Sequence, residues 1–375
     1  MVKKIKVGLI FGGRSGEHEV SLMSARSVMK AIDKEKYDVI PIGITKEGKW
    51  IAGGDPMKAL TGQTMNDVSE ATLLSDPGHR ALMQVRPAGP GDTAVTLSSI
   101  TEVDVMFPVL HGTFGEDGTV QGLLELANIP YVGAGVVGSA VGMDKAVFKD
   151  VMRANGIPVP EHVLITRAEI ERDPGGAARK VEAALRFPIF CKPANLGSSV
   201  GVTKAHDRAG LIGGLREAAR WDRRVLAERG INAREIEVSV LGNDAPIASV
   251  PGEVISSREF YDYSAKYLDE SSELIIPANL PEATAAEARR MAVGAFKAID
   301  GAGMARVDFL LDKDSGQLYV SEINTIPGFT QISMYPKLWE ASGISYTELI
   351  DRLIELALER QADKDNTLRS YEVNE

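Results

Sequence analysis

The first 45 residues constrain the fold more than any other stretch of the chain. Residues 5–11 form an apolar run that ends in a glycine-rich turn, residues 19–32 have the pattern of a helix, and residues 37–45 form a second apolar run. A strand, a helix and a strand in this order form a βαβ unit, whose two strands are parallel. The sequence therefore predicts an N-terminal α/β domain built on a parallel sheet.

Length and composition narrow the class of protein further. The chain has 375 residues, of which 44% are hydrophobic and 25% charged, as in an ordinary globular protein of roughly two or three domains. The net charge of −10 argues against nucleic-acid and anionic-membrane partners, and no apolar run approaches the ~20 residues of a membrane helix. The single cysteine, Cys191, permits no internal disulfide, which favours a cytoplasmic compartment. We interpret Cys191 itself as a small buried hydrophobe.

Turn residues and composition divide the rest of the chain. Residues 46–100 are punctuated by glycine and proline, and we interpret them as an insertion of short strands and loops in the first domain. The last helix is expected over residues 346–360. The expected divisions are an N-terminal domain (1–134), a central subdomain (135–231), a C-terminal subdomain (232–360) and a polar tail (361–375).

Two apolar strands near the C-terminus, 304–311 and 317–324, carry the strongest chemical signal. Turn residues between them predict a hairpin. Side chains two apart on a strand share a face, which brings together a guanidinium, two carboxylates and an amide, those of Arg306, Asp308, Glu322 and Asn324. Oxygen ligands of this kind suit Mg²⁺, which also bridges substrate phosphates. The alternative is a solvent-facing strand with ordinary salt bridges.

A second signal is Phe-Pro-Ile-Phe-Cys-Lys-Pro-Ala-Asn-Leu-Gly-Ser-Ser-Val-Gly over residues 187–201. A buried strand presents Lys192 and leads into a glycine–serine loop, whose amides and hydroxyls can bind phosphate oxygens. The chain contains no GxxxxGK[ST] pattern. A nucleotide site at this loop is therefore not a P-loop.

Two further motifs are weaker when taken alone. Gly-Gly-Arg-Ser-Gly-Glu at residues 12–17 lacks the G-x-G-x-x-G spacing of a dinucleotide site. We interpret it as a tight turn that delivers Glu17 at a helix start, the alternative being a carboxylate that only favours the helix dipole. The polar, aromatic run Tyr-Asp-Tyr-Ser-Ala-Lys-Tyr at residues 261–267 is typical of a closing lid or a partner contact.

Seven motifs, in this order along the chain, resemble those of the D-alanine–D-alanine ligases of the ATP-grasp superfamily. They are Gly-Gly-Arg-Ser-Gly-Glu-His-Glu-Val-Ser, His-Gly-x-x-Gly-Glu-Asp-Gly, Met-Asp-Lys, Lys-Pro-x-x-x-Gly-Ser-Ser-Val-Gly, Tyr-Asp-Tyr-x-x-Lys-Tyr, Arg-x-Asp and Glu-x-Asn-Thr-x-Pro-Gly. The resemblance spans residues 4–358 and implies a three-domain ATP-grasp fold of α/β and α+β domains. It implies ATP-dependent ligation of two D-alanine molecules through a D-alanyl phosphate, with release of ADP and phosphate, for peptidoglycan precursor synthesis.

The resemblance also implies which residues bind the nucleotide and the metal. Two lysines neutralise the phosphates, the glycine–serine loop closes over them, Glu228 accepts from the adenine amino group and Glu235 holds the ribose. Two Mg²⁺ ions, for which Mn²⁺ can substitute, are implied at Asp308, Glu322 and Asn324. The implied ATP-binding residues are Lys145, Lys192, Gly197, Ser198, Ser199, Glu228, Arg229, Ile231, Glu235, Phe260 and Lys266.

For the amino acids, the resemblance implies that Glu17 pairs with the ammonium of the first D-alanine. Arg306 and the Gly328 amide form the oxyanion site. Tyr267 bonds to Ser198, which in turn meets Glu17, and this chain of contacts latches the lid. The implied catalytic residues are Glu17, Ser198, Lys266, Tyr267 and Arg306. The implied substrate-binding residues are Glu17, His111, Gly328, Ser333 and Met334.

Two other activities compete with this interpretation. Related D-alanine–D-lactate ligases commonly carry a histidine near Tyr267, so the tyrosine favours the dipeptide, with a depsipeptide ligase as the alternative. A degenerate, non-enzymatic ATP-grasp module would lack a metal ligand or a phosphate lysine, and this chain retains all of them. The family habit implies a homodimer, and no nucleic acid or membrane partner is implied.

Overall fold

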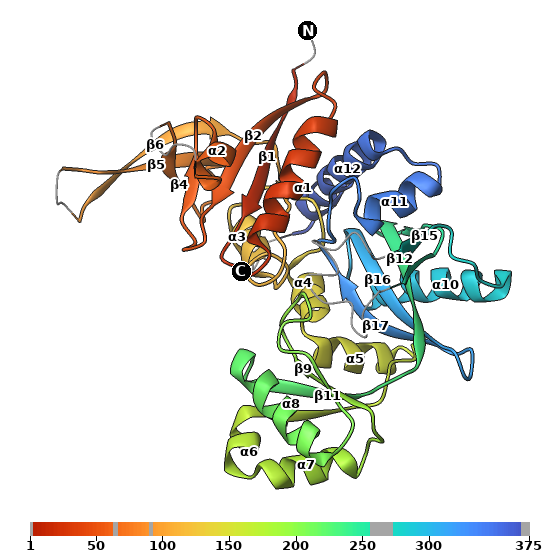
Figure 1. Ribbon diagram of the computed structural model, residues 1–375. Helices are drawn as coiled ribbons and strands as arrows, with labels where there is room; N and C mark the ends of the chain where they lie inside the picture. The colour runs from red at the N-terminus through yellow and green to blue at the C-terminus, as the bar shows by residue number, and fades with distance from the viewer. Residues whose placement is uncertain (1–2, 63–66, 90–92, 256–272, 369–375) are drawn as a thin grey trace, which may run out of the picture.

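Three β-sheets, each flanked by helices, form the framework of the molecule (Figure 1). The computed structural model describes residues 3–62, 67–89, 93–255 and 273–368. The first sheet contains parallel strands and the other two are antiparallel, which confirms the predicted combination of α/β and α+β domains. No helix in these ranges has the length and apolar character needed to span a membrane.

The first sheet has the strand order β6-β5-β4-β3-β2-β1-β7. One of its strands, β1 (Ile5–Gly12), pairs in parallel with β2 (Tyr37–Ile44) and with β7 (Val105–Pro108). The helix α1 (His18–Ala31) connects β1 to β2. The predicted βαβ unit is therefore confirmed, and β1 leads into the turn that carries Glu17.

The insertion extends this sheet with antiparallel strands. They are β3 (Trp50–Ala52), β4 (Ser69–Leu73), β5 (Ala81–Pro87) and β6 (Val95–Glu102). A short helix that was not predicted, α2 (Pro56–Leu60), begins where Asp55 accepts a bond from the Lys58 amide. Figure 1 shows the ribbon of β5 and β6 projecting away from the rest of the molecule.

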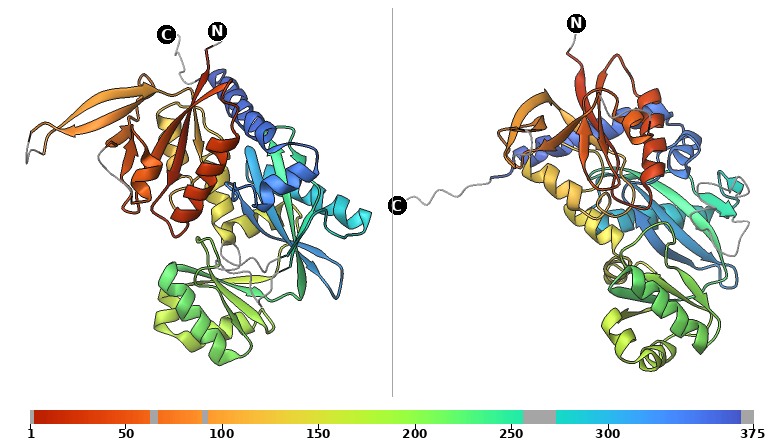
Figure 2. Two further views of the ribbon diagram at one scale, coloured as in Figure 1. Left: turned by 45° about the horizontal axis from the view of Figure 1, so that its top comes forward. Right: turned by 60° about the vertical axis from the view of Figure 1, so that its left-hand side comes forward.

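The second sheet forms a small lobe, which stands apart from the other two sheets in Figure 2. Its order is β10 (Thr203–Ala205), β9 (Ile189–Pro193), β11 (Arg224–Arg229) and β8 (His162–Thr166). The lobe also contains α6 (Arg167–Arg172), α7 (Pro174–Glu182) and α8 (Arg208–Trp221). Cys191 is fully buried in its core, and burial raises the pKa of the thiol to about 12. The interpretation of Cys191 as a buried hydrophobe is confirmed.

The third sheet carries the predicted hairpin. Its order is β15 (Glu273–Ile275), β14 (Gly252–Ile255), β12 (Ala233–Gly242), β16 (Gly303–Asp312) and β17 (Leu318–Asn324), with β13 (Ile247–Ala248) beside β12. The helices α10 (Glu282–Ala298) and α5 (Lys145–Ala154) share an apolar core with this sheet. Three further short helices are α3 (Thr119–Leu126), α4 (Val136–Met143) and α11 (Met334–Ala341).

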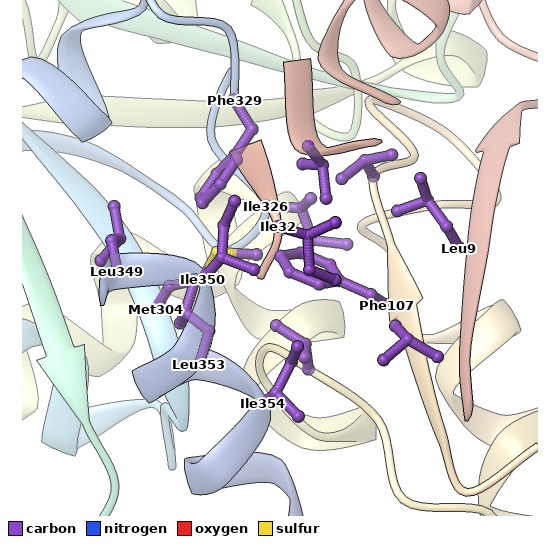
Figure 3. Packing of buried hydrophobic residues seen from close by; sticks show 14 of the residues in the cluster. Leu9, Ile32, Phe107, Met304, Ile326, Phe329, Leu349, Ile350, Leu353 and Ile354 are labelled. Carbon is purple, nitrogen blue, oxygen red and sulfur yellow. The ribbon is translucent and has the colours of Figure 1, made fainter. Parts of the chain in front are cut away.

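The helix α12 (Tyr346–Asp365) packs against both the first and the third sheets. Its side chains Ile350 and Leu353 are fully buried and belong to one apolar cluster with Phe107 of β7 and Met304 of β16 (Figure 3). Burial of such an apolar stripe is the main source of stability for a helix of this kind. This helix therefore joins the N-terminal sheet to the hairpin.

The helix α12 also continues inside the segment that was predicted to be a polar tail. Arg360 donates to the carbonyl oxygen of Tyr131 at 2.9 Å, and Lys364 pairs with Glu125 of α3. The charged side chains of this last turn thus bind elements next to the first sheet. The local composition is that of a tail, but these tertiary contacts extend the helix.

Candidate active site

Two large cavities meet where the three sheets converge. One, of about 910 Å³, lies between the turn after β1 and the loop after β17; the other, of about 940 Å³, lies between the second and third sheets. Both are lined by Lys145, Gly197, Ser198, Glu237 and Glu322. Ligands bound in the two cavities would therefore approach one another at these residues.

The hairpin presents its polar face to this junction. Asp308 pairs with Glu322 across the two strands, and Arg306 pairs with Asn324, as the alternation of side chains predicts. The Arg306 guanidinium donates two hydrogen bonds of 2.7 Å to the Asp308 carboxylate, and the Asn324 amide donates one of 3.0 Å. The polar face is thus a connected network in a cavity wall.

A third carboxylate, Glu237, joins this network from β12. It pairs in register with Asp308, is only 6% exposed, and its Oε2 lies 2.9 Å from the Arg306 Nε. Glu237 was not among the predicted site residues. The available signal was its position two residues after Glu235, which places both side chains on one face of the strand.

The donor set of the hairpin fits Mg²⁺. Asp308, Glu322 and Asn324 offer hard oxygen atoms, and both carboxylates line the second cavity. Each carboxylate has a cation nearby, Arg306 at Asp308 and Lys145 at 3.6 Å from Glu322, so this surface attracts positive charge. In the described ranges no group of three or more His, Cys, Asp or Glu side chains could hold a metal ion. A site of two carboxylates and an amide leaves coordination positions for phosphate oxygens and water.

The two lysines predicted at the phosphates line the second cavity from different elements. Lys145 begins α5, where Asp144 caps the helix, and its ammonium donates to the Leu196 carbonyl oxygen at 2.7 Å. Lys192 projects from β9, and its ammonium lies 2.6 Å from the Glu228 carboxylate. Burial opposes the charge on Lys192, but Glu228 and neighbouring carboxylates outweigh burial and raise the pKa of Lys192. Lys192 is therefore a cation in the cavity wall.

The glycine–serine loop contacts the first domain at the cavity junction. The Ser198 hydroxyl donates a hydrogen bond to the Glu17 carboxylate, and a Cβ atom at Gly197 would lie 3.3 Å from Glu17 Oε2. Ser198 and Ser199 have φ angles of 53° and 55°, in the left-handed region that ordinary residues rarely adopt. Such strain persists where surrounding contacts hold it, and it is concentrated at functional loops.

The residues predicted at the nucleoside also line the second cavity. Glu228 and Arg229 end β11, Ile231 follows, and Glu235 lies near the start of β12, all lining this cavity. The Arg229 amide donates to the Glu161 carbonyl oxygen at 2.9 Å, which fixes the course of the chain here. Burial opposes the charge on Glu228, but the surrounding lysines outweigh burial and bring the pKa of this carboxyl to about 2.

The first cavity carries the residues predicted at the amino acids. Glu17, His111, Gly328, Ser333 and Met334 all line it. Met334 is the first residue of α11. A carboxylate placed here would face a helix N-terminus, where amide groups and the helix dipole favour an anion.

The imidazole of His111 is neutral and fixed in one tautomer. Its Nδ1 lies 2.9 Å from the Ile326 carbonyl oxygen, so Nδ1 carries the proton, and its Nε2 lies 3.0 Å from the Ser24 hydroxyl. The Phe329 amide donates to the same hydroxyl, so Ser24 donates its own proton to His111. Burial lowers the pKa of His111, in agreement with this arrangement. His111 therefore holds the loop that carries Gly328.

Glu116, a further residue that was not predicted, also lines the first cavity. Its carboxyl group accepts from the Gly112 amide at 2.7 Å and from the Ile326 amide at 3.1 Å. Glu116 thus ties a loop of the first domain to the loop after β17. It lies inside the motif His-Gly-x-x-Gly-Glu-Asp-Gly, so a signal was present, although only His111 of this motif was predicted to have a role.

Three of the predicted site residues lie outside the described residues. They are Phe260, Lys266 and Tyr267. The other half of the predicted latch, the contact of Ser198 with Glu17, lies within the described residues.

Comparison with known proteins identifies the family. The D-ala D-ala ligase N-terminus model matches residues 6–134, and the D-ala D-ala ligase C-terminus model matches residues 151–355. This chain belongs to the D-alanine–D-alanine ligase family. The family resemblance carried by the seven motifs is therefore confirmed.

Relatives that match over nearly their whole length agree with membership in the D-alanine–D-alanine ligase family. The D-alanine–D-alanine ligase of Natranaerobius thermophilus is 49% identical over 371 residues, which cover 99% of this chain and 99% of the relative. That of Caldicellulosiruptor bescii is 50% identical over 369 residues, which cover 98% of this chain and 99% of the relative.

Solved structures of D-alanine ligases share the fold. The VanG D-Ala:D-Ser ligase from Enterococcus faecalis has a TM-score of 0.83 at 36% identity, covering 95% of this chain and 100% of that one. The D-alanine-D-alanine ligase from Coxiella burnetii has a TM-score of 0.80 at 36% identity, covering 97% of each chain. This likeness confirms the predicted fold class, a three-domain ATP-grasp fold.

Proposed function

We propose that this protein uses ATP to join two D-alanine molecules, forming D-alanyl-D-alanine, ADP and phosphate. The observation that carries the proposal is the junction of the two cavities at Lys145, Ser198 and Glu322. A nucleotide in the second cavity and two amino acids in the first would meet there. Similarity over nearly the whole chain to proteins named D-alanine–D-alanine ligase supports the same substrates.

The reaction proceeds in two steps whose atoms balance. A carboxylate oxygen of the first D-alanine attacks the γ-phosphorus of ATP, and ADP leaves. The amine of the second D-alanine, after losing a proton, attacks the acyl carbon, and phosphate leaves. Both steps bring anions together, so cationic and hydrogen-bond-donating groups must surround the transferred group.

Residues of this chain meet that requirement. Lys145 and Lys192 reduce the repulsion among the phosphates, and Glu17 holds the ammonium group of the first D-alanine. Arg306 and the Gly328 amide stabilise the oxyanion of the tetrahedral intermediate. These groups come from separate elements around the cavity junction, so the folded chain brings them to one place.

The second D-alanine binds by its carboxylate at the start of α11. Ser333 and the Met334 amide provide the hydrogen-bond donors there. The dipole of the helix favours a negative charge at this end. The amino group of the second D-alanine is then free to face the acyl carbon of the first.

A bound metal ion would supply the remaining positive charge. Asp308, Glu322 and Asn324 would hold Mg²⁺, or Mn²⁺ in its place, which offsets the negative charge of the phosphates. The two carboxylates lie opposite one another on neighbouring strands, so both face the same part of the cavity wall and could hold one cation together.

Residues 260–267, proposed as a lid, would complete the site. Tyr267 would bond to Ser198 and exclude water from the acyl phosphate, while Phe260 and Lys266 would contact the nucleotide. Exclusion of water matters because hydrolysis of the acyl phosphate would waste ATP.

Family membership supports a proposal for the compartment and the oligomeric state of the enzyme. We place it in the cytoplasm as a homodimer that supplies a peptidoglycan precursor. Light scattering of the purified protein tests the dimer, and cell fractionation tests the compartment.

The sharpest test of the proposed reaction is to determine which second substrate the enzyme joins to D-alanine. We expect phosphate release with ATP, Mg²⁺ and D-alanine alone, and a dipeptide by mass spectrometry, across a pH range of about 6 to 9. D-lactate and D-serine serve as competitors, because a depsipeptide ligase is the alternative and one structural relative is named a D-Ala:D-Ser ligase. A product with D-lactate or D-serine that dominates near neutral pH would overturn the specificity but leave the ATP site in place.

A further inference from the structure

A buried ion triad contains two residues that line the second cavity, Lys192 and Glu228. The Lys149 ammonium, on α5, is 2.7 Å from Glu228 Oε2, and the Lys192 ammonium is 2.6 Å from Glu228 Oε1. The side chains of Lys149 and Glu228 are 1% and 2% exposed. Each oxygen of this carboxylate therefore has an ammonium partner of its own.

The two lysines hold Glu228 from different sides. Glu228 and Lys192 line the second cavity, whereas Lys149 is not among the residues that line it. Lys149 also donates to the Ser321 carbonyl oxygen at 2.9 Å, and Ser321 directly precedes Glu322 in β17. Lys149 thus lies outside the lining of the second cavity. It joins β11 to β17, the strand that carries the predicted metal ligand Glu322.

Removing Lys149 would leave a buried carboxylate with one partner instead of two. Burying a charge is costly unless it is paired, so the carboxylate would then shift toward other partners or toward its protonated form. Burial lowers the pKa of Lys149, and Glu228 counteracts this effect. The lysines act on Glu228 in turn. Although burial opposes the charge on Glu228, Lys149 and Lys192 lower the pKa of its carboxyl group and keep it ionised.

An ionised carboxylate only accepts hydrogen bonds, and its two oxygens offer about four lone-pair sites. Glu228 therefore keeps acceptor capacity beyond its two lysine partners. A purine with an amino group at position 6 can donate to such a carboxylate. A purine with a carbonyl group at that position would bring two acceptors together, which is repulsive and leaves both without a partner.

We propose that Lys149 is a positioning residue that holds Glu228 as a fixed, acceptor-only carboxylate and thereby selects 6-amino purine nucleotides over 6-oxo purine nucleotides. The proposal rests on the nucleotide site proposed above, with the base beside Glu228 in the second cavity. Lys149 acts through Glu228 and does not touch the nucleotide.

The test compares ATP with inosine triphosphate, which differs at position 6 of the base, in the full-length protein. We expect Lys149→Met to lower the ratio of kcat/KM for ATP to that for inosine triphosphate by about tenfold or more, since a misplaced acceptor discriminates less. The KM for ATP rises, while the KM for D-alanine stays within about twofold, because the first cavity is untouched. Lys149→Arg, which keeps the positive charge, restores part of the ratio.

A double-mutant cycle distinguishes positioning from general stability. In the Glu228→Gln background, Lys149→Met should change the nucleotide ratio no further, since the group through which it acts is gone. Lys180→Met, which removes a surface lysine paired with Glu169 at 2.9 Å, serves as the matched control and should leave the ratio unchanged. A ratio that stays at the wild-type value in a folded Lys149→Met protein would overturn the proposal.

Equilibrium binding separates this inference from the proposed function. Calorimetric titration of the protein with Mg·ATP and with Mg·inosine triphosphate needs no turnover. If the wild type releases no phosphate with D-alanine, the proposed ligation fails, and the binding ratio still tests Lys149. If ligation occurs but neither the binding ratio nor the kinetic ratio responds to Lys149→Met, only the inference fails.

Discussion

The Ser198 hydroxyl donates a hydrogen bond to the Glu17 carboxylate across a sequence separation of 181 residues. This bond links the loop after β9 in the small lobe to the turn after β1 in the first domain. Both residues line the first cavity, and Ser198 also lines the second. The contact therefore couples the phosphate loop to the residue proposed to hold the first amino acid.

Loss of this hydrogen bond should lower the yield of dipeptide per ATP hydrolysed more than it lowers the stability of the fold. For Ser198→Ala we expect kcat for the dipeptide to fall by about tenfold to hundredfold, because the loop and Glu17 are no longer held in register. Phosphate released per dipeptide should exceed one, since a looser site admits water to the acyl phosphate. Paired assays of phosphate and dipeptide measure both effects. Ser98→Ala, on the exposed strand β6, is the control, and equal yields in both variants would contradict the latch.

Replacement of a predicted metal ligand should stop the reaction without unfolding the protein. Glu322→Gln keeps the shape of the side chain but removes its charge, and we expect turnover at saturating Mg²⁺ to fall by at least about a hundredfold. Glu322 is 26% exposed and 3.6 Å from Lys145, so the loss of that pair should cost at most about 1 kcal/mol. Turnover assays and thermal melts measure the two quantities. Glu340→Gln, exposed on α11, is the control; near-normal turnover of Glu322→Gln would remove this residue from the metal site.

The pH dependence of stability should report Glu116. Burial, followed by the nearby Glu17 carboxylate, raises the pKa of Glu116 from its usual value of 4.5 to about 8. The folded state thus favours the protonated form, so this stabilisation is complete below pH 4.5 and is lost as the pH rises through about 8. We expect the melting temperature of the protein without ligands to decline across this window, and to decline less in Glu116→Gln.

The control for Glu116 is another glutamate. Glu171→Gln, exposed on α6, should keep the wild-type slope of melting temperature against pH. Absolute stability will differ in Glu116→Gln, because an amide nitrogen there would face a backbone N–H, so only the slope is compared. Identical slopes in all three proteins would show that Glu116 titrates as an ordinary surface carboxyl.

The helix α12 should be essential to the stability of the N-terminal half. Leu353 is fully buried between the first sheet and the hairpin, and Leu353→Ala should lower the free energy of unfolding by about 2–5 kcal/mol. Denaturant unfolding measures this change. Glu359→Ala, on the exposed side of the same helix, should change it by less than about 0.5 kcal/mol. Similar values for both variants would mean that α12 is not part of the core.

Local patterns in the sequence predicted the elements that carry the site. The alternation of side chains placed Arg306, Asp308, Glu322 and Asn324 on one face of a hairpin, and the observed register agrees. The order of apolar and helical segments predicted the βαβ unit. These features depend on periods of two and 3.6 residues, which are readable within one element.

Such local patterns did not predict the contacts between segments that are distant in the sequence. Glu116 meets Ile326 across 210 residues, and Lys149 meets Ser321 across 172. The charge-rich end of α12 has the composition of a tail, yet its contacts with the first domain make it helix. No local period specifies which charge meets which partner when chain segments fold against one another.

The sequence by itself therefore determined the strands, the hairpin face and, through its motifs, the family. The tertiary structure decided that Glu237 shares Arg306 with Asp308, that His111 is a neutral support for a loop, and that Lys149 braces Glu228. The physical reason is burial, because a charge or a polar group removed from water must find a partner, and only the packed fold determines which partner lies within reach.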